Sequence, residues 1–224
     1  EEHRPFIPIR LHTAIQEELN RKDLVLDWAA FFGRDNKTYP EPDRWNSEVI
    51  GQLIEVKEFI LRNRTHRHLC VTGNRRLSAS LCIGSVFSAT SGFTVEMEYR
   101  EGVWWKTNDH AGEEDAVQLS VTQPEVLGEH LVVSIGIPRD IGAAVQNYLS
   151  DQDEPGLPTL NISFTQPITS ARQANAVVGR IKAEMLHAIA LTRANQVHLF
   201  CAVPAFIALL LGHRLNATAP IQCY

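Results

Sequence analysis

The sequence predicts an α/β fold built from two similar halves, each with a mainly parallel central sheet flanked by helices. Two short apolar segments, 68–72 and 131–137, are each followed by an arginine-bearing turn and then by a helical pattern. A third apolar segment, 197–203, runs directly into a helix through Pro204, a residue suited to the first turn of a helix. Continuous apolar runs of this length are typical of parallel strands covered on both faces, so we expect repeated strand–turn–helix units.

Composition limits the possible functions. The chain has 224 residues, 44% of them hydrophobic, enough to bury a large core. Its net charge is -5 and its 21 lysines and arginines are scattered, which argues against a broad duplex-binding face but allows a local pocket for a small anion. The cysteines lie in apolar runs without a CxxC pair, as expected in a reducing cytoplasm: Cys70, Cys82, Cys201 and Cys223. The apolar run that contains Pro204 is too short to cross a membrane.

In the first 64 residues the sequence predicts a linker, a loop and a helix, and none of the candidate ligand residues lies there. Residues 1–10 are expected to form an extended linker, and the segment that follows ends in Trp28, Phe31 and Phe32, whose rings should pack on the core. Residues 32–44 have the composition of a loop. A helix is predicted from Trp45, capped by Asn46 or Ser47, because apolar residues recur at helical spacing: Trp45, Val49, Leu53, Val56 and Ile60.

The first strand–turn–helix unit consists of a strand at 68–72, the turn Gly73-Asn-Arg-Arg76 and a helix from Leu77 to about Ala89. One glycine is too few for the dinucleotide-binding fingerprint. Arg75 and Arg76 stand where a phosphate would meet the start of the helix, and guanidinium groups bind phosphate through two hydrogen bonds. The alternative is that both arginines are simply solvated.

A half-exposed strand at 93–99 is followed by Val103-Trp-Trp-Lys106. Adjacent residues of a strand point to opposite faces, so at most one of Trp104 and Trp105 can be in the core. An exposed tryptophan beside Lys106 would form a platform for a purine base. Alternatively, this tryptophan packs beneath the acidic loop 108–115.

The second half repeats this plan. A strand at 131–137, a turn that contains Arg139 and a helix at 141–149 follow a weaker strand within 117–128. The remaining expected elements are a strand at 159–165, an amphipathic helix at 168–194, the strand at 197–203, a helix at 205–211 with Gly212 as its left-handed cap, and a strand at 220–224.

Ligands of open α/β sheets gather at the carboxyl ends of the strands, so the turns at 72–76, 136–140, 165–167 and 202–205 are expected to converge. Helix N-termini there would add positive potential for an anion. The candidate ligand-binding residues are Thr72, Gly73, Asn74, Arg75, Arg76, Trp104, Trp105, Lys106, Arg139, Thr165, Gln166, Ala202 and Pro204.

No catalytic or metal site is predicted. The chain has no GxSxG, Walker or HExxH motif, and His66 and His68 have no third metal ligand near them in the sequence. A carboxylate–lysine cluster of Glu96, Glu98 and Lys106 across a hairpin is conceivable, but we did not favour it. We therefore expect no catalytic residues, no metal and no cofactor.

A family resemblance comes from the C-terminal motifs His198-Leu-Phe-Cys-Ala-Val-Pro-Ala205, Leu211-Gly-His-Arg-Leu-Asn216 and Ile221-Gln-Cys-Tyr224. They resemble the C-terminal signature of SAVED domains, the sensors of bacterial CBASS anti-phage effectors, which are related to CARF sensors. The resemblance implies a domain at 11–224 made of two fused CARF-like, Rossmann-like halves, about 45–128 and 129–224.

The same resemblance implies a cytoplasmic bacterial sensor of a cyclic oligonucleotide made by a cognate nucleotidyltransferase. A cyclic dinucleotide such as a cGAMP isomer is favoured over a cyclic trinucleotide, and binding is expected to drive homo-oligomerisation. The chain most resembles sensors fused behind an HNH endonuclease, so residues 1–10 would be a linker remnant from an absent effector domain. Only that effector domain would contact DNA. The alternatives are a ring nuclease using Thr72, Ser134 or Thr165, and a dinucleotide-binding or structural interaction domain.

Overall fold

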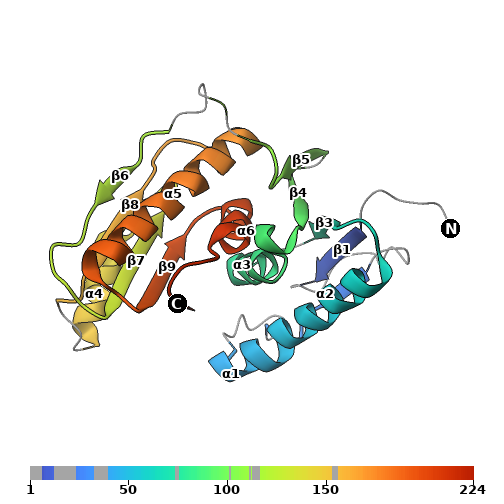
Figure 1. Ribbon diagram of the computed structural model, residues 1–224, viewed down its shortest axis with the longest axis horizontal. Coiled ribbons are helices and arrows are strands. Elements are labelled where there is room, and N and C mark those ends of the chain that lie inside the picture. Colours follow the sequence, from blue (N-terminus) through green and yellow to red (C-terminus); the bar gives the residue numbers. More distant parts are fainter. Residues whose placement is uncertain are drawn as a thin grey trace. The chain divides into compact units, whose positions relative to one another are not determined.

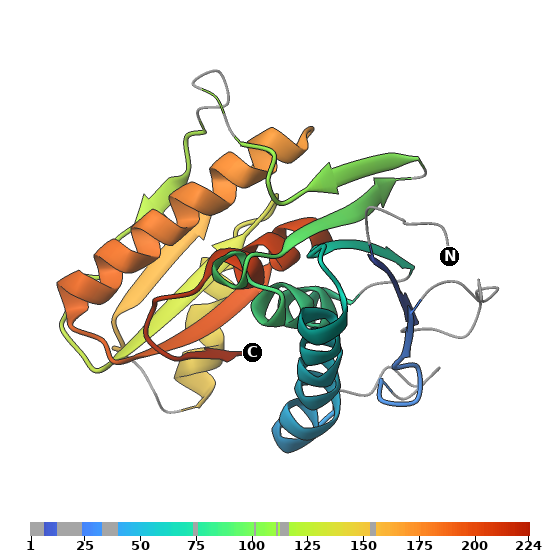
Figure 2. The same ribbon diagram turned by 45° about the vertical axis from the view of Figure 1, so that its right-hand side comes forward.

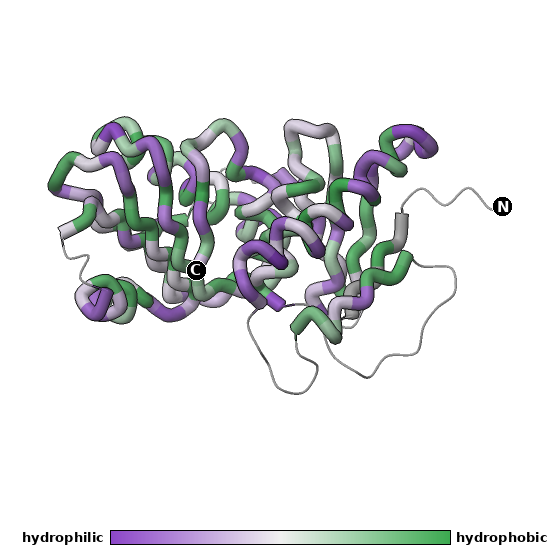
Figure 3. Tube along the Cα trace, turned by 90° about the horizontal axis from the view of Figure 1, so that it is seen from below, coloured by the Kyte–Doolittle hydropathy of each residue, from purple (hydrophilic) through white to green (hydrophobic). Residues whose placement is uncertain are grey.

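The computed structural model describes residues 7–12, 24–32, 40–73, 76–100, 102–110, 112, 117–152 and 156–224. The chain forms two compact units. The first comprises Glu1–Asp109 and Ala208–Asn216, and the second comprises His110–Ile207 and Ala217–Tyr224. Hydrophobic and hydrophilic segments alternate along the trace of each unit, as expected where strands and helices bury one side (Figure 3).

The first unit has a five-stranded sheet of order β2-β1-β3-β4-β5. Its strands are β1 (Ile7–His12), β2 (Leu24–Asp27), β3 (His68–Gly73), β4 (Thr94–Arg100) and β5 (Val103–Lys106). The first four are parallel, and β5 pairs antiparallel with β4. We had assigned residues 1–10 to a linker, but Ile7 to Arg10 lie in β1 between two neighbouring strands.

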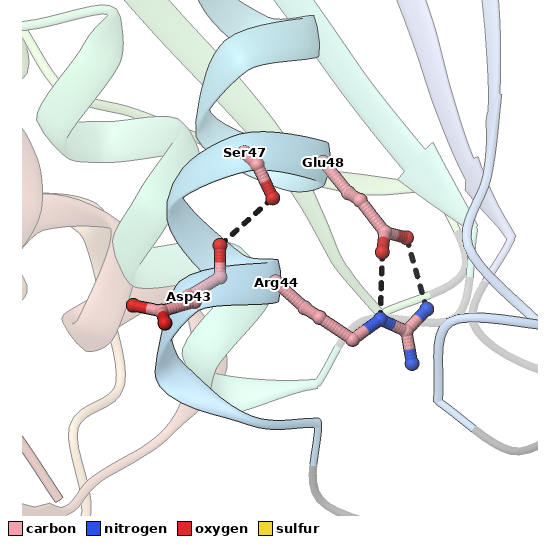
Figure 4. Close-up of polar contacts among 4 residues, drawn as sticks. All are labelled: Asp43, Arg44, Ser47 and Glu48. Carbon is pink, nitrogen blue, oxygen red and sulfur yellow. Dashed lines mark hydrogen bonds and ion pairs between the residues drawn. The ribbon is translucent and has the colours of Figure 1, made fainter.

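The helical layer of the first unit starts with α1 (Pro42–Arg44), a π-helical turn η2 (Trp45–Ile50) and α2 (Gly51–Asn63). The predicted start at Trp45 is therefore wrong by three residues, because Pro42 opens the helix. Ser47 does not cap it either: its hydroxyl donates to the carbonyl of Asp43 at 2.8 Å, beside the Arg44–Glu48 ion pair (Figure 4). The predicted apolar positions Val49, Leu53 and Ile60 are buried.

Aromatic side chains fill the space beside this helix, as predicted. Trp28, Phe31 and Phe32 are 4%, 6% and 1% exposed. Phe31 and Phe32 contact each other and Trp45 edge to face, with ring centroids 5.0–5.4 Å apart. Trp28 donates its indole N–H to Gln52 Oε1 at 2.6 Å, which satisfies its polar group.

The second unit has a sheet of order β10-β9-β7-β8-β6. Its strands are β6 (Ser120–Thr122), β7 (His130–Gly136), β8 (Thr159–Ser163), β9 (Gln196–Ala202) and β10 (Ile221–Cys223), and β6 alone is antiparallel to its neighbour. Helix α4 (Gly142–Asp151) packs on Val132 through Val145 and Leu149. Helix α5 (Ala171–Thr192) covers the opposite face (Figures 1 and 2). The central strand β7 is consequently buried on both sides from Leu131 onward.

The two sheets share one plan, four parallel strands and an antiparallel edge strand, which confirms the predicted α/β fold with two similar halves. Their connectivity differs, because β1 and β2 precede the central strand β3, whereas β9 and β10 follow the central strand β7. The compact units divide after Asp109, earlier than the boundary at 128 that we assigned, because β6 bonds to β8 of the second sheet.

Helix α3 (Leu77–Val86), followed by the 3-10 turn η3 (Ala89–Ser91), meets helix α6 (Ala205–Arg214) within the first unit. Gly212 was predicted to cap α6, but it lies inside the helix, and a Cβ there would be 2.2 Å from the carbonyl oxygen of Leu81. A Cβ on Gly84 would be 2.0 Å from the carbonyl oxygen of Leu209. The absence of side chains at both glycines thus allows the two backbones to touch.

Strand β9 is covered less completely than we predicted. Val197 and Leu199 are fully buried, whereas His198 and Phe200 on the other face are partly exposed. None of the helices in the described ranges combines the length and apolar character that a membrane span requires.

Candidate functional site

Three of the predicted ligand residues lie on one face of the first sheet. Cys70, Glu96 and Lys106 are direct neighbours across β3, β4 and β5, and Glu98 pairs with Trp104. Side chains two positions apart in a strand point the same way, so Thr72 shares this face with Trp104 and Lys106. We call the residues Thr72, Glu96, Glu98, Trp104, Lys106 and His68 the polar face.

The two adjacent tryptophans have different environments, as predicted. Trp104 is 36% exposed on the polar face, whereas Trp105 is 5% exposed on the other side of β5. The Trp105 ring stacks on Tyr99, with centroids 3.8 Å apart and planes 8° apart. The structure therefore places Trp105, which we had included among the ligand residues, in the core, where it supports the strand that carries Trp104.

A carboxylate lies beside the lysine of the polar face. Glu96, whose side chain is 13% exposed, has its Oε2 atom 3.3 Å from both Lys106 Nζ and His68 Nε2. Glu98 accepts a hydrogen bond from the backbone N–H of Gly102 at 3.3 Å. The hairpin thus brings together Glu96 and Lys106, an arrangement that we had not favoured. Because carboxylates offset the lysine, this face suits a stacked base with N–H or O–H donors better than a bare phosphate.

The turn after β3 lies partly outside the described residues, which do not include Asn74 and Arg75. Gly73 has φ of 90°, a conformation that favours glycine. The Arg76 guanidinium lies 4.5 Å from the Phe32 ring centroid, and its Nη2 atom donates to the Phe32 carbonyl at 3.4 Å. Among the described residues no side chain caps α3, so its first N–H groups remain suited to an anion.

In the second unit, the start of α4 is already occupied by a carboxylate. Asp140 Oδ1 accepts from the backbone N–H of Gly142 at 2.7 Å, and Asn161 Nδ2 lies 3.3 Å from both Asp140 oxygens. The Gly142 N–H contributes most to lowering the pKa of Asp140, and Asn161 and Ser163 add to it. Asn161 is fixed in turn by the buried Ser134, which donates to its Oδ1 at 2.6 Å. The Asp140 carboxylate thus occupies the start of this helix, so the exposed Arg139 is the group at this turn for which anion binding remains a prediction.

The three second-unit turns that we expected to converge do lie at one sheet edge. They follow β7, β8 and β9, which are neighbours, and Ile137 N–H donates to the Ala202 carbonyl at 2.9 Å. Thr165, Gln166 and Ala202 are exposed there, and Pro204 is partly buried. The turn at 72–76 belongs to the first unit, so the convergence of all four turns remains a prediction.

The second unit contains a histidine–aromatic cluster that was not predicted from the sequence. Hydrogen bonds of 2.9 Å join His130 Nδ1 to His198 Nε2, and His198 Nδ1 to the Tyr224 hydroxyl. Phe200 stacks on Tyr224, with centroids 4.5 Å apart. The alternation of His198 and Phe200 with Val197 and Leu199 was the available signal, but the run looked uniformly apolar. The described residues hold no group of three or more His, Cys, Asp or Glu side chains able to bind a metal.

The signature dipeptide His213-Arg214 makes backbone contacts within the first unit. His213 Nδ1 donates to the Phe87 carbonyl at 2.6 Å, and Arg214 Nη2 donates to the Thr107 carbonyl at 3.2 Å. Burial is the largest cause that lowers the pKa of His213, and it also lowers that of Arg214. Both contacts span more than 100 residues of sequence, so spacing could not have revealed them.

Comparison with known proteins gives a consistent picture. The family model described as "SMODS-associated and fused to various effectors sensor domain", SAVED, matches residues 52–224. Two curated relatives, both CD-NTase-associated protein 4, come from an Acinetobacter strain and from Moraxella osloensis. Each is 30% identical over 218 residues, which cover 97% of this chain and 46% of the relative. The chain thus spans about half the length of these relatives.

Solved structures of Cap4 SAVED/CARF-domain receptors are also similar. The Acinetobacter baumannii receptor with the cyclic trinucleotide 2'3'3'-cAAA has a TM-score of 0.82 at 27% identity, covering 98% of this chain and 49% of that chain. The same receptor with 3'3'3'-cAAA has a TM-score of 0.79, with the same identity and coverage. The Moraxella osloensis receptor has a TM-score of 0.73 at 28% identity, covering 97% of this chain and 46% of that chain.

Proposed function

Because this chain belongs to the SAVED family of sensor domains, we propose that it binds a cyclic oligonucleotide messenger on behalf of a longer anti-phage effector. The observation that carries the proposal is the polar face, where the exposed Trp104 lies on the same side of the sheet as Thr72 and Lys106. One receptor of similar fold, from Acinetobacter baumannii, has been solved with two different cyclic trinucleotides, which supports this class of ligand.

In the proposed complex, one base stacks on Trp104. Stacking on an exposed ring is strong and tolerant of base identity. The carboxylates of Glu96 and Glu98 accept N–H groups of the base or hydroxyls of the ribose. Phosphates are met by the start of α3 after Arg76, which has no side-chain cap among the described residues. That Arg139, Thr165 and Gln166 of the second unit also bind the ligand remains a prediction.

The size of the ligand is open to a direct test. The family resemblance led us to expect a cyclic dinucleotide, but both ligand-bound structures of the Acinetobacter baumannii receptor hold cyclic trinucleotides, so the preference for a dinucleotide has no support from them. We therefore propose cyclic trinucleotides as the first ligands to try. Calorimetry against cyclic tri- and dinucleotides, linear trinucleotides and NAD should give a Kd of about 1 μM or below for one cyclic species only.

The same experiment distinguishes the alternatives. If no cyclic species binds, the sensor proposal is wrong, and if NAD alone binds, the chain is a dinucleotide-binding domain. Chromatography of the ligand after incubation shows whether it has been cleaved. A linear product would favour the ring nuclease, although Ser134 already donates its hydroxyl hydrogen to Asn161.

Replacing Trp104 with alanine is expected to weaken ligand binding about tenfold, because it removes the ring on which a base stacks. Val103→Ala is the matched control, since Val103 is 46% exposed on the same strand and its side chain points away from the polar face. Calorimetry on both variants tests this expectation. Equal affinities would show that the base does not stack on Trp104.

We further propose that ligand binding drives oligomerisation and so activates a fused effector in the bacterial cytoplasm. Ligand can favour the assembled state only by binding it more tightly, and a hundredfold preference corresponds to about 2.7 kcal/mol. Light scattering with and without ligand measures the change in mass. The HNH endonuclease remains a prediction for the full-length protein, tested by incubating that protein with ligand and DNA.

A further inference from the structure

The end of α6 contacts the residues that directly follow β5, which carries Trp104 and Lys106, and α3, which begins after Arg76. Thr107, whose carbonyl accepts from Arg214, directly follows Lys106 at the end of β5. Phe87, whose carbonyl accepts from His213, directly follows the last residue of α3, the helix that begins after Arg76. Two consecutive side chains therefore hold the carboxyl ends of β5 and of α3.

Strand β5 depends on a small number of contacts. It is four residues long, lies at the edge of its sheet and pairs with β4, where the register shifts between Glu98 and Arg100. Its carboxyl end is fixed through Thr107, which is 3% exposed. Thr107 donates its N–H to the Val95 carbonyl at 2.9 Å, and its hydroxyl accepts from the Val95 N–H at 3.0 Å. The Arg214 guanidinium adds a bond from outside the sheet.

Arg214 is partly buried, so its charge loses part of its hydration, which makes it a costly residue for filling space. An apolar side chain of similar size could pack in the same position without this cost. The guanidinium instead donates to the carbonyl at the base of the strand that carries Trp104 and Lys106. Its planar, forked shape fixes direction as well as distance, which a flexible ammonium would not do.

We propose that Arg214 is a positioning residue that sets the orientation of β5, and hence of Trp104, for ligand binding. This inference rests on the proposed function of the polar face. Arg214 acts through the Thr107 carbonyl and has no ligand contact assigned to it. When the hydrogen bond from Arg214 to the Thr107 carbonyl is lost, the contacts with β4 are the ones described above that still hold the end of β5. Trp104 then samples more orientations, and a base stacks on it less often.

A double-mutant cycle tests this coupling with 2'3'3'-cAAA as the probe. Arg214→Gln is expected to weaken binding about tenfold in the wild-type background but less than about threefold when Trp104 is already alanine. Arg214→Lys should fall between wild type and Arg214→Gln, because it keeps the charge but loses the fork. An equal loss in both backgrounds overturns the inference, since a general loss of stability would not depend on Trp104.

A measurement without ligand separates this inference from the proposed function. Hydrogen exchange should speed up in Arg214→Gln for the peptide that covers residues 103–110, which contains the Thr107 amide, but not for peptides of β3. Unchanged exchange at 103–110 overturns the positioning role, whatever the ligand does. Faster exchange at 103–110, combined with unchanged affinity in the Trp104→Ala variant, supports the role of Arg214 in fixing β5 and rejects the polar face as the ligand site.

Discussion

Replacing Gly84 with alanine is expected to lower the free energy of unfolding by about 3 kcal/mol. The new Cβ would lie 2.0 Å from the Leu209 carbonyl oxygen and 2.7 Å from the His213 backbone nitrogen. Both atoms belong to the backbone, so no side-chain rotation relieves the clash and α6 must move away from α3. The cost of this overpacking exceeds the gain of about 1 kcal/mol that alanine normally brings to a helix.

The matched control is Gly51→Ala. Gly51 also lies in a helix, but the nearest atom to its Cβ position is the Asn46 carbonyl oxygen at 3.8 Å, an ordinary contact. This variant should keep or slightly raise the stability, by up to about 1 kcal/mol. Urea denaturation of the two variants measures the difference. Equal stabilities would mean that the two helices do not cross as closely as the structure shows.

The buried strands of the fold were predictable because their signal is local. The apolar runs at 131–137 and 159–165 correspond to β7 and β8, and the spacing of apolar residues predicted α5. β1 was missed because Pro8 and Arg10 interrupt its apolar residues and give it the composition of a linker. Gly212 was misassigned because a glycine at a helix crossing and a glycine at a helix end look alike until the partner helix is known.

The candidate site was predictable to the same extent. Alternation within one strand predicted that Trp104 and Trp105 face opposite ways, but not which of them is buried. Alternation could not show that Asn161, 21 residues later on another strand, helps to hold the Asp140 carboxylate at the start of α4. Nor could it show that Arg76 packs on Phe32, since 44 residues separate them. Local periodicity fixes which face a side chain occupies, whereas its partners depend on tertiary contacts.

His213→Ala is expected to destabilise the protein by about 3 kcal/mol. His213 is 3% exposed and donates to the Phe87 carbonyl at 2.6 Å, so alanine leaves a cavity and a buried acceptor without this donor. His213→Asn is the matched variant, because an asparagine amide can place an N–H close to the position of Nδ1. It should recover at least about 1 kcal/mol of the loss. Denaturation curves that coincide for the two variants would show that the hydrogen bond contributes little.

The same histidine should also make stability depend on pH. Burial lowers its pKa in the folded protein below the ordinary value of 6.5, so the unfolded chain binds a proton at a higher pH than the fold does. Stability is therefore lost as the pH falls through 6.5, and the loss stops once the folded protein is protonated as well. Between about pH 7.5 and about pH 5.5 this one group can lower the free energy of unfolding by at most about 1.4 kcal/mol.

His213→Asn should show a smaller difference in unfolding free energy between these two pH values than wild type, because its side chain does not titrate. An identical pH dependence in both proteins would mean that His213 is protonated as easily in the fold as in the unfolded chain, which its burial argues against.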